Sequence, residues 1–371
     1  MANRLIPITD IVDTISDTHN FSGEELFAVN TSDVLEGKLL SPELLPISKL
    51  KGQFKKTFLK NDILFSEIRP ANRRYAFIDF DPDNRYVAST KLMVLRKKND
   101  DIDLRYFYYF LTSQHFLNIL QNRAENRIGS FPQITYELLG EYSVPCPELA
   151  IQQRISEVLK KIDDSIENND LAIEKIRKTL IKYAEMNHTL GTSKKRLESI
   201  CIKDRRAITD YNKGLKTVDL ATIDSDTLNL KRFSCSSDFG TNLFTINKYD
   251  LFYGSIRPYL HKSGISPFDG AVAGTVYSFK VSDDFMPLIL GLISTESFHN
   301  YALANANGTK MPVADYDSLM NFEFNFSADL IKKYNTHMIS LVKQCVFLME
   351  MNQKLMEQRE TLRKNLYGRE W

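Results

Sequence analysis

The sequence has few residues of the kinds that form covalent cross-links or metal sites. Only four cysteines occur in 371 residues, and none of them forms a Cys-x-x-Cys pair: Cys146, Cys201, Cys235 and Cys345. This spacing predicts neither a disulfide framework nor a zinc knuckle. The six histidines are equally scattered, and no two of them lie three or four residues apart. We therefore expect no metal site.

Long apolar runs and an excess of one charge are also lacking. No window approaches the roughly 18 consecutive apolar residues of a membrane span, and the first residues form no signal-peptide pattern. We therefore expect a soluble, cytoplasmic protein. The formal net charge of +1 argues against a protein that coats nucleic acid without selectivity. With 43% hydrophobic residues, 371 residues suffice for two domains with sizeable cores.

The most informative feature that is present is an internal repeat. Asp62–Phe65 and Ile68-Arg69-Pro70 recur 188 residues later as Asp250–Tyr253 and Ile256-Arg257-Pro258, with no gap inside the block. The order of further matches is preserved, and only the loop lengths differ. These matches pair Arg4-Leu5 with Arg196-Leu197, Ser113–Phe116 with Thr295–Phe298, and Gly129, Pro132, Tyr136 and Leu139 with Gly308, Pro312, Tyr316 and Leu319. The sequence thus predicts two similar units in a pseudo-two-fold symmetric molecule.

Each unit closes on a stretch with heptad periodicity. Apolar residues spaced by four and three predict a coiled-coil seam, a stripe that faces another helix. Its expected members are Ile155, Leu159, Ile162, Ile166, Asn169, Ile173, Ile176, Leu180 and Tyr183 in the first stretch, and Tyr334, Met338, Leu341, Cys345, Leu348, Asn352, Leu355 and Leu362 in the second. Asn169 and Asn352 are lone polar residues there, which either fix the register of the pair or lie at a frayed edge.

The two stretches are long enough that they should pair with each other. A helix of about 40 residues is about 60 Å long, which exceeds what one domain covers. Two units related by a two-fold axis would make the pair antiparallel. A mixed α/β fold is expected for the rest. We place the two α/β domains at 1–147 and 191–328 and long helices at 148–190 and 329–371.

Short runs bounded by Asn, Asp, Gly and Pro predict strands in both units. They are Ile63–Phe65, Tyr75–Ile78 and Lys91–Leu95 in the first, and Leu243–Ile246, Leu251–Ile256 and Val276–Val281 in the second. A helix is expected over Leu104–Asn122, and another around Pro287–Asn305.

Several of these strings resemble one protein family over the whole chain. They are Gly129–Thr135, the run Val144-Pro145-Cys146-Pro147 followed by Ile151–Ile155, and Ile162-Asp163 within a long helix. They are similar to the specificity subunit of type I restriction-modification systems. The resemblance implies two target-recognition domains and two conserved helices that read a bipartite double-stranded DNA site. The second copy departs from the pattern, because Asn325-Phe326-Ser327 replaces the proline-rich junction.

Cations and amides near the predicted strands are the candidate DNA contacts, because phosphates need cations and base edges need forked donors. Arg69, Asn72, Arg73 and Arg74 follow one strand, and Arg257, His261 and Lys262 occupy the corresponding place in the second copy. A solvated turn is the alternative interpretation. A second candidate surface comprises Lys91, Arg127 and Ser130 in the first unit and Thr275 and Lys310 in the second.

Motifs for catalysis are missing. Asp81-Pro82-Asp83-Asn84 lacks the second proline and the aromatic residue of a methyltransferase loop that holds a flipped base, and no P-loop is present. We expect a non-catalytic subunit with no cofactor, whose partners are methyltransferase subunits, two by the pseudo-symmetry, and a restriction and translocase subunit. Two alternatives stay open: a specificity subunit of a combined enzyme that cuts and methylates, and a coiled-coil scaffold that never touches DNA.

Overall fold

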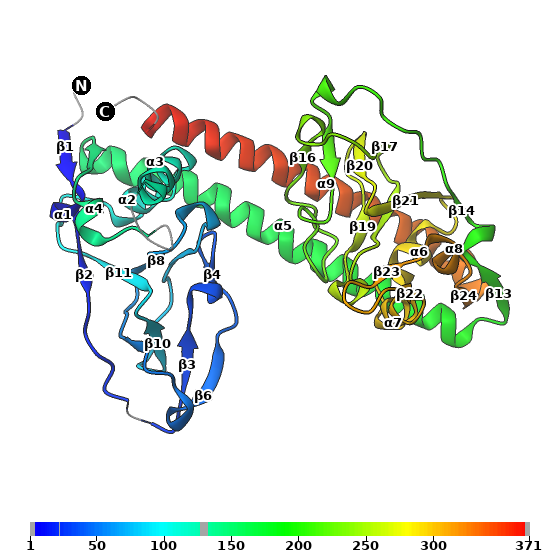
Figure 1. Ribbon diagram of the computed structural model, residues 1–371, viewed down its shortest axis with the longest axis horizontal. Coiled ribbons are helices and arrows are strands. Elements are labelled where there is room, and N and C mark those ends of the chain that lie inside the picture. The colour runs from blue at the N-terminus through cyan, green and yellow to red at the C-terminus, as the bar shows by residue number, and fades with distance from the viewer. Residues whose placement is uncertain (1–3, 22, 127–132, 368–371) are drawn as a thin grey trace. The chain divides into compact units, whose positions relative to one another are not determined.

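The computed structural model describes residues 4–21, 23–126 and 133–367. These residues form two compact units, one containing the chain up to Asp163 together with the residues from Glu357 on, and the other running from Asp164 to Met356. Both are mixed α/β, as the sequence predicts (Figure 1). Within the described residues, no helix combines the length and the apolar character that a membrane span needs.

The first unit is built on two four-stranded sheets, ordered β2-β11-β8-β9 and β6-β3-β10-β7, and a two-stranded sheet β1-β12. Its strands are β1 (Arg4–Pro7), β2 (Val12–Ile15), β3 (Glu25–Val29), β4 (Val34–Leu35), β5 (Lys38–Leu39), β6 (Glu43–Pro46), β7 (Phe54–Lys56), β8 (Ile63–Ser66), β9 (Tyr75–Phe77), β10 (Tyr86–Ser89), β11 (Leu92–Lys97) and β12 (Ser143–Cys146). Its short helices are α1 (Ile8–Ile11), η1 (Thr31–Asp33), η2 (Ile47–Lys49), η3 (Pro70–Asn72), α2 (Leu104–Leu111), α3 (Gln114–Glu125) and α4 (Tyr136–Leu139).

The second unit has the same sheets in the same order, β14-β21-β18-β19, β16-β15-β20-β17 and β13-β24. Its strands are β13 (Ser193–Arg196), β14 (Cys201–Ile202), β15 (Lys216–Val218), β16 (Ser234–Cys235), β17 (Leu243–Ile246), β18 (Leu251–Gly254), β19 (Ser263–Ile265), β20 (Gly270–Ala273), β21 (Val276–Val281), β22 (Ala306–Asn307), β23 (Val313–Ala314) and β24 (Glu323–Phe326). Its short helices are η4 (Leu197–Ser199), η5 (Tyr211–Lys213), η6 (Ser236–Asp238), η7 (Pro258–Leu260), α6 (Met286–Leu292), α7 (Glu296–Ala304) and α8 (Tyr316–Met320).

The internal repeat is confirmed down to single hydrogen bonds. The Asp62 carboxylate accepts from Leu59 N at 2.7 Å, and the Asp250 carboxylate accepts from Asn247 N at 2.7 Å. Asn61 and Tyr249, which precede these aspartates, both have a φ of 72°. The repeated block therefore specifies one local structure, in which a buried carboxylate caps the turn before the central strand.

The predicted pairing of Arg4-Leu5 with Arg196-Leu197 is wrong by three residues. Ile8 N donates to Tyr142 O, and Leu197 N donates to Phe322 O, so Ile8 is the counterpart of Leu197. The sequence similarity gave the wrong alignment because three of the four residues in each strand are exposed, and exposed positions place little constraint on the residue type. The buried apolar residue and its backbone partner define the true alignment.

Each of the two short helical regions is divided, where the sequence predicted one helix. The helix is interrupted between α2 and α3 at Thr112-Ser113, and between α6 and α7 at Ile293–Thr295. Ser113 Oγ accepts from Phe116 N, and Thr295 Oγ1 accepts from Phe298 N, both at 3.3 Å. A hydroxyl that caps the following turn favours a new helix start over continuation, which the apolar periodicity alone does not reveal.

Two long helices pass from one unit into the other, α5 (Leu149–Leu190) and α9 (Ala328–Tyr367). They pack antiparallel, because in the second unit Asn169 contacts Asn352 while Asn187 Oδ1 accepts from Ser327 N. In the first unit Arg359 Nη1 lies 2.7 Å from Asp163 Oδ1, and Leu159 and Tyr367 belong to the same core. The antiparallel helix pair predicted from the heptads is therefore present in both units.

The buried stripe of α9 is broader than a heptad seam. Val342, Cys345, Val346 and Met349 are fully buried, whereas the predicted seam residues Met338, Leu341 and Leu348 are only partly buried. Leu362, also predicted for the seam, is 38% exposed, and Arg363 and Tyr367 face inward instead. The helix packs against its own α/β unit as well as against α5, so its apolar face is wider than a two-helix seam requires.

Candidate nucleic-acid interface

Two equivalent turns carry the predicted cations. In the first unit the chain leaves β8 and enters η3 through Arg69, whose φ is 47°, and in the second it leaves β18 and enters η7 through Arg257, whose φ is 54°. Such left-handed conformations cost a non-glycine residue about 1–3 kcal/mol and concentrate at functional sites. Proline at the first helical position then fixes the next φ.

Three backbone segments converge at each turn. Ile68 pairs with Gln133 in an isolated bridge, and Glu67 N donates to Lys91 O at 3.0 Å. The second unit repeats this arrangement, because Arg257 N donates to Pro312 O at 2.7 Å and Ser255 N donates to Thr275 O at 2.9 Å. The two candidate surfaces of each unit are therefore one surface, formed by loops that are distant in the sequence.

The predicted residues fall into two groups by what their side chains contact. Arg69, Asn72, Lys91, Arg257, Thr275 and Lys310 are exposed. Among the residues that the structure describes, the side chains of Arg69, Arg257 and Lys310 make no hydrogen bond or ion pair, so these cations are available to a ligand. Arg127 and Ser130 lie outside the described residues.

Four other predicted residues have side chains that are engaged within the protein. Arg73 contacts Glu36 and Gln114, and its counterpart His261 lies 3.0 Å from Asp226 Oδ1 and 3.7 Å from Glu296 Oε2. Arg74 donates to the carbonyl of Ser32 at 2.9 Å, and its counterpart Lys262 donates to that of Leu220. These four side chains hold the turn against neighbouring loops. Their contacts within the protein account for these residues at least as well as DNA binding does.

The electrostatics beside the first turn differ from those of the second. Glu67 follows β8 and lies 4.0 Å from Lys56 Nζ. Burial raises the pKa of Glu67 and lowers the pKa of Lys56, and the two opposite charges counteract these shifts. The second unit has Ser255 at the position of Glu67 and Phe244 at the offset of Lys56. The first interface is therefore more strongly charged than the second around its central turn.

Two exposed residues of the second interface were not predicted. Tyr259 in η7 is 48% exposed, and Met311 in the loop that pairs with this turn is 50% exposed. The repeat contained a signal for the first of them, since Tyr259 stands where the first unit has Ala71. Apolar residues were not considered because cations and amides had been taken as the only DNA-reading groups.

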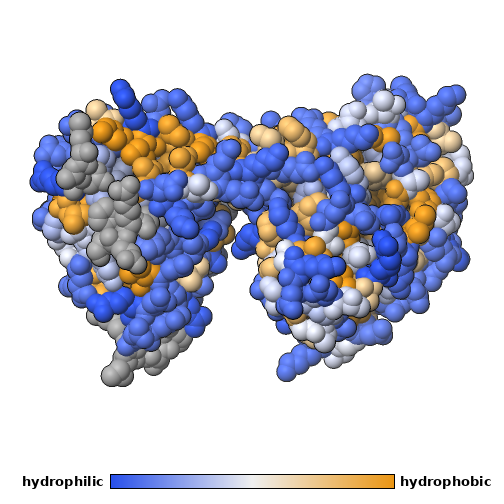
Figure 2. Space-filling view, turned by 90° about the horizontal axis from the view of Figure 1, so that it is seen from above, coloured by the Kyte–Doolittle hydropathy of each residue, from blue (hydrophilic) through white to orange (hydrophobic). Residues whose placement is uncertain are grey.

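The outer faces of the long helices also keep apolar side chains exposed. Val158 and Leu171 on α5 are 50% and 56% exposed, and Phe347 on α9 is 56% exposed. Figure 2 shows orange hydrophobic patches between hydrophilic stretches on the face that it draws. Large apolar patches on a protein surface commonly mark contacts with other macromolecules.

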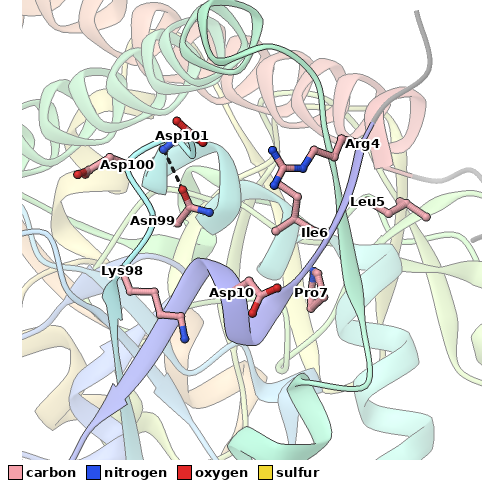
Figure 3. A pocket seen from close by; sticks show the side chains of 9 residues that line it. All are labelled: Arg4, Leu5, Ile6, Pro7, Asp10, Lys98, Asn99, Asp100 and Asp101. Carbon is pink, nitrogen blue, oxygen red and sulfur yellow. Dashed lines mark hydrogen bonds between the residues drawn. The ribbon is translucent and has the colours of Figure 1, made fainter.

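A depression at the first strand of the chain does not suit a phosphate. It is lined by Arg4, Leu5, Ile6, Pro7, Asp10, Lys98, Asn99, Asp100 and Asp101 (Figure 3). Its three carboxylates outnumber its two cations, and Lys98 Nζ donates to Asp13 Oδ1 at 3.1 Å. A negatively charged ligand would be repelled there, so the turns at Arg69 and Arg257 remain the candidate interface.

Comparison with known proteins points to one protein family. Residues 33–177 match the family model described as "Type I restriction modification DNA specificity domain". Over 177 residues the chain is 38% identical to the specificity subunit of the type I restriction enzyme HindI of Haemophilus influenzae. About half of the chain is thus similar to a type I specificity subunit. This match covers 47% of the chain and 38% of that type I specificity subunit, which is well under half of the relative's length.

One solved S subunit of a type I system shares the fold. The S subunit of a type I restriction-modification system from M. genitalium aligns over 99% of both chains with a TM-score of 0.54 and 15% identity. The HsdS subunit from Thermoanaerobacter tengcongensis covers 98% of this chain and 96% of its own length, with a TM-score of 0.42 and 14% identity. At 15% identity, the likeness to the M. genitalium S subunit concerns the fold alone, which contains two α/β units and two long helices.

Proposed function

We propose that this chain is the DNA-recognition subunit of a type I restriction-modification complex. Each α/β unit reads one half of a bipartite double-stranded site, and the boundaries 1–147, 148–190, 191–328 and 329–371 separate readers from connecting helices. One observation carries the proposal. Equivalent turns in two similar units present Arg69 and Arg257 in left-handed conformations, with exposed side chains that make no hydrogen bond or ion pair among the described residues. The family match of the first unit supports the same function.

Recognition by these turns would combine cation and groove contacts. Arg69 and Arg257 are placed to donate two parallel hydrogen bonds to a guanine edge, the commonest specific contact in the major groove. Lys91 and Lys310 lie on loops adjoining these turns and are placed to reach phosphates, which fix orientation but carry no sequence information. The side-chain amide of Asn72 can form two hydrogen bonds with an adenine edge, one as donor and one as acceptor.

Chemistry would come from other subunits. We propose that two methyltransferase subunits and a restriction and translocase subunit bind this chain, and the exposed apolar residues of α5 and α9 support a docking role for those helices. The two helices continue through both units, so their length would set the spacer between the half-sites. The chain itself would act without a cofactor, in the cytoplasm, by recognising the site and positioning its partner subunits on the DNA.

Co-expression with the methyltransferase subunit tests the proposal, followed by genome-wide methylation mapping. The expected result is one bipartite motif with a fixed spacer. A continuous motif, or no sequence-dependent methylation by an assembled complex, would contradict it. An assembled complex that shows no salt-dependent affinity for DNA would favour the scaffold alternative, because phosphate contacts release counterions. A single partner that both cuts and methylates would identify the combined enzyme.

A further inference from the structure

The second unit presents an apolar contact next to its exposed arginine. Tyr259 follows Arg257 by two residues in η7, and Met311 precedes Pro312, whose carbonyl accepts from Arg257 N. The two side chains are 48% and 50% exposed. Ile256 also pairs with Val313, so the segments that carry Tyr259 and Met311 are joined by two neighbouring backbone contacts.

Cations flank this apolar pair. Arg257 and Lys310 stand beside Tyr259 and Met311 in their two segments, and neither cation is paired within the described residues. A surface that combines unpaired cations with exposed apolar groups is complementary to a DNA groove, where phosphates border the base edges. Within a groove, the apolar group that a base presents is the C5 methyl of thymine.

We propose that Tyr259 and Met311 contact a thymine methyl group in the second half-site, with Lys310 on an adjacent phosphate. This inference rests on the proposed function and adds a specificity-determining pair to it. The first unit has Ala71 at the position of Tyr259, so at this turn it lacks the ring. Phe131 stands where the second unit has Met311, so readout through the ring of Tyr259 is what distinguishes the second half-site from the first.

The test uses the assembled complex with its methyltransferase subunits and a duplex containing the mapped site. Each thymine of the second half-site is replaced in turn by uracil, which keeps every hydrogen bond and removes only the methyl group. One replacement should weaken binding about fourfold, the effect of burying one methyl-sized group. Replacements in the first half-site serve as the matched DNA control for this turn.

Variants then assign the effect to the residues. In Tyr259→Ala the same uracil replacement should have no further effect, whereas Tyr259→Phe should respond as the unaltered protein does. Ile202→Ala is the matched protein control, because Ile202 is 65% exposed on β14 of the same unit, where it pairs with Lys280 rather than with the turn. It should leave both the affinity and the uracil effect unchanged.

Several outcomes would overturn the inference while leaving the proposed function intact. They are a second half-site with no A·T pair, uracil replacements that all leave binding unchanged, and a Tyr259→Ala complex that retains the full uracil effect. Failure of Tyr259→Ala to assemble with the methyltransferase would also overturn it, since that result would make Tyr259 a protein contact. Absence of any sequence-dependent methylation would instead contradict the proposed function itself.

Discussion

At the scale of single residues, exposure and backbone conformation separate candidate readers from supports. Arg69 and Arg257 are the exposed cations of the two turns, whereas Arg73 and His261 are anchored to carboxylates and, for Arg73, to Gln114. An arginine that holds a loop and one that reads a base are indistinguishable by charge. Their roles differ because the first kind has its donors satisfied inside the protein and the second has them open to solvent.

Replacing each exposed arginine should affect only its own half-site. Arg69→Ala is expected to cost about 1–3 kcal/mol of discrimination at one position of the first half-site, and Arg257→Ala the same in the second. Methylation mapping of the complex, with binding to duplexes altered one position at a time, measures both. Equal losses in both halves from one substitution would contradict independent readers.

Arg74→Ala is the matched control for Arg69→Ala. It removes hydrogen bonds to the carbonyls of Ser32 and Val34, and should lower the free energy of unfolding by about 1 kcal/mol. The recognised sequence should stay unchanged, because the removed guanidinium is engaged within the unit. A change of recognised base in Arg74→Ala, with the fold intact, would show that this residue reads DNA as well.

A buried histidine should make the second unit sensitive to acid. Burial and the neighbouring His261 lower the pKa of His299 to about 3, and its ring stacks on His261 at 4.2 Å. In the unfolded chain this histidine has an ordinary pKa near 6.5. Between about pH 3 and pH 6.5 the unfolded chain therefore binds more protons than the folded chain. This contribution to stability is therefore fully present above pH 6.5 and is lost as the pH falls toward 3.

Urea unfolding between pH 7.5 and pH 5 measures this contribution. The denaturation midpoint should fall more steeply with decreasing pH in the unaltered protein than in His299→Gln, which cannot take up the proton. Comparing the two profiles removes the contribution of the carboxylates, which both proteins share. Parallel profiles would show that His299 is protonated equally in the folded and unfolded chain.

At the scale of elements, a polar layer sets the register of the long helices. Asn169 Nδ2 donates to Asn352 Oδ1 at 2.8 Å, and Asn352 Nδ2 donates to Asp170 Oδ1 at 2.9 Å. Asp170 also accepts from Asn229 and pairs with Lys231. The frayed-edge interpretation does not apply to Asn352, which is 1% exposed. A slip of the helices would leave these amides buried without partners.

A double-mutant cycle tests the register role. Asn169→Val should cost about 1–3 kcal/mol, because it leaves the Asn352 oxygen buried and without its donor. Asn169→Val with Asn352→Leu should recover part of that loss, since apolar pairs suit a helix interface. Chemical denaturation gives each value. Strictly additive effects would mean that the two amides are energetically independent.

The elements show where sequence patterns suffice and where they do not. The bounds of β17 and β21 equal those predicted, because short apolar runs between turn formers leave little choice. The single helices predicted over 104–122 and 287–305 were wrong, since Ser113 and Thr295 act as caps rather than as interior residues. A hydroxyl can do either, and its backbone context decides.

At the scale of the whole molecule, α5 and α9 are the elements that link the two readers. Inserting one heptad into both helices between the units, after Asp163 and after Met356, adds about 10 Å to each. The preferred spacer should then lengthen by about three base pairs at about 3.4 Å per base pair, with both half-sites unchanged. Methylation mapping reads this directly, and an unchanged spacer would refute the idea that the helices measure distance.

A heptad in α5 alone is the control for that experiment. It shifts Asn169 by two turns against Asn352 and separates the paired amides, so the complex should lose stability or activity instead of gaining a new spacer. A defined longer spacer from the single insertion would contradict the requirement for matched helices.

The sequence by itself determined the duplication, the strand cores and the two long helices, because these depend on local periodicity and on residues repeated at a fixed offset. The tertiary structure alone decided which of the cations around Arg69 and Arg257 are free. It also decided that Val342 and Val346 lie inside while Leu362 is partly exposed, and that Tyr259 and Met311 emerge at one turn. Such outcomes depend on contacts between segments far apart in the chain, and the spacing of residues along the sequence carries no record of them.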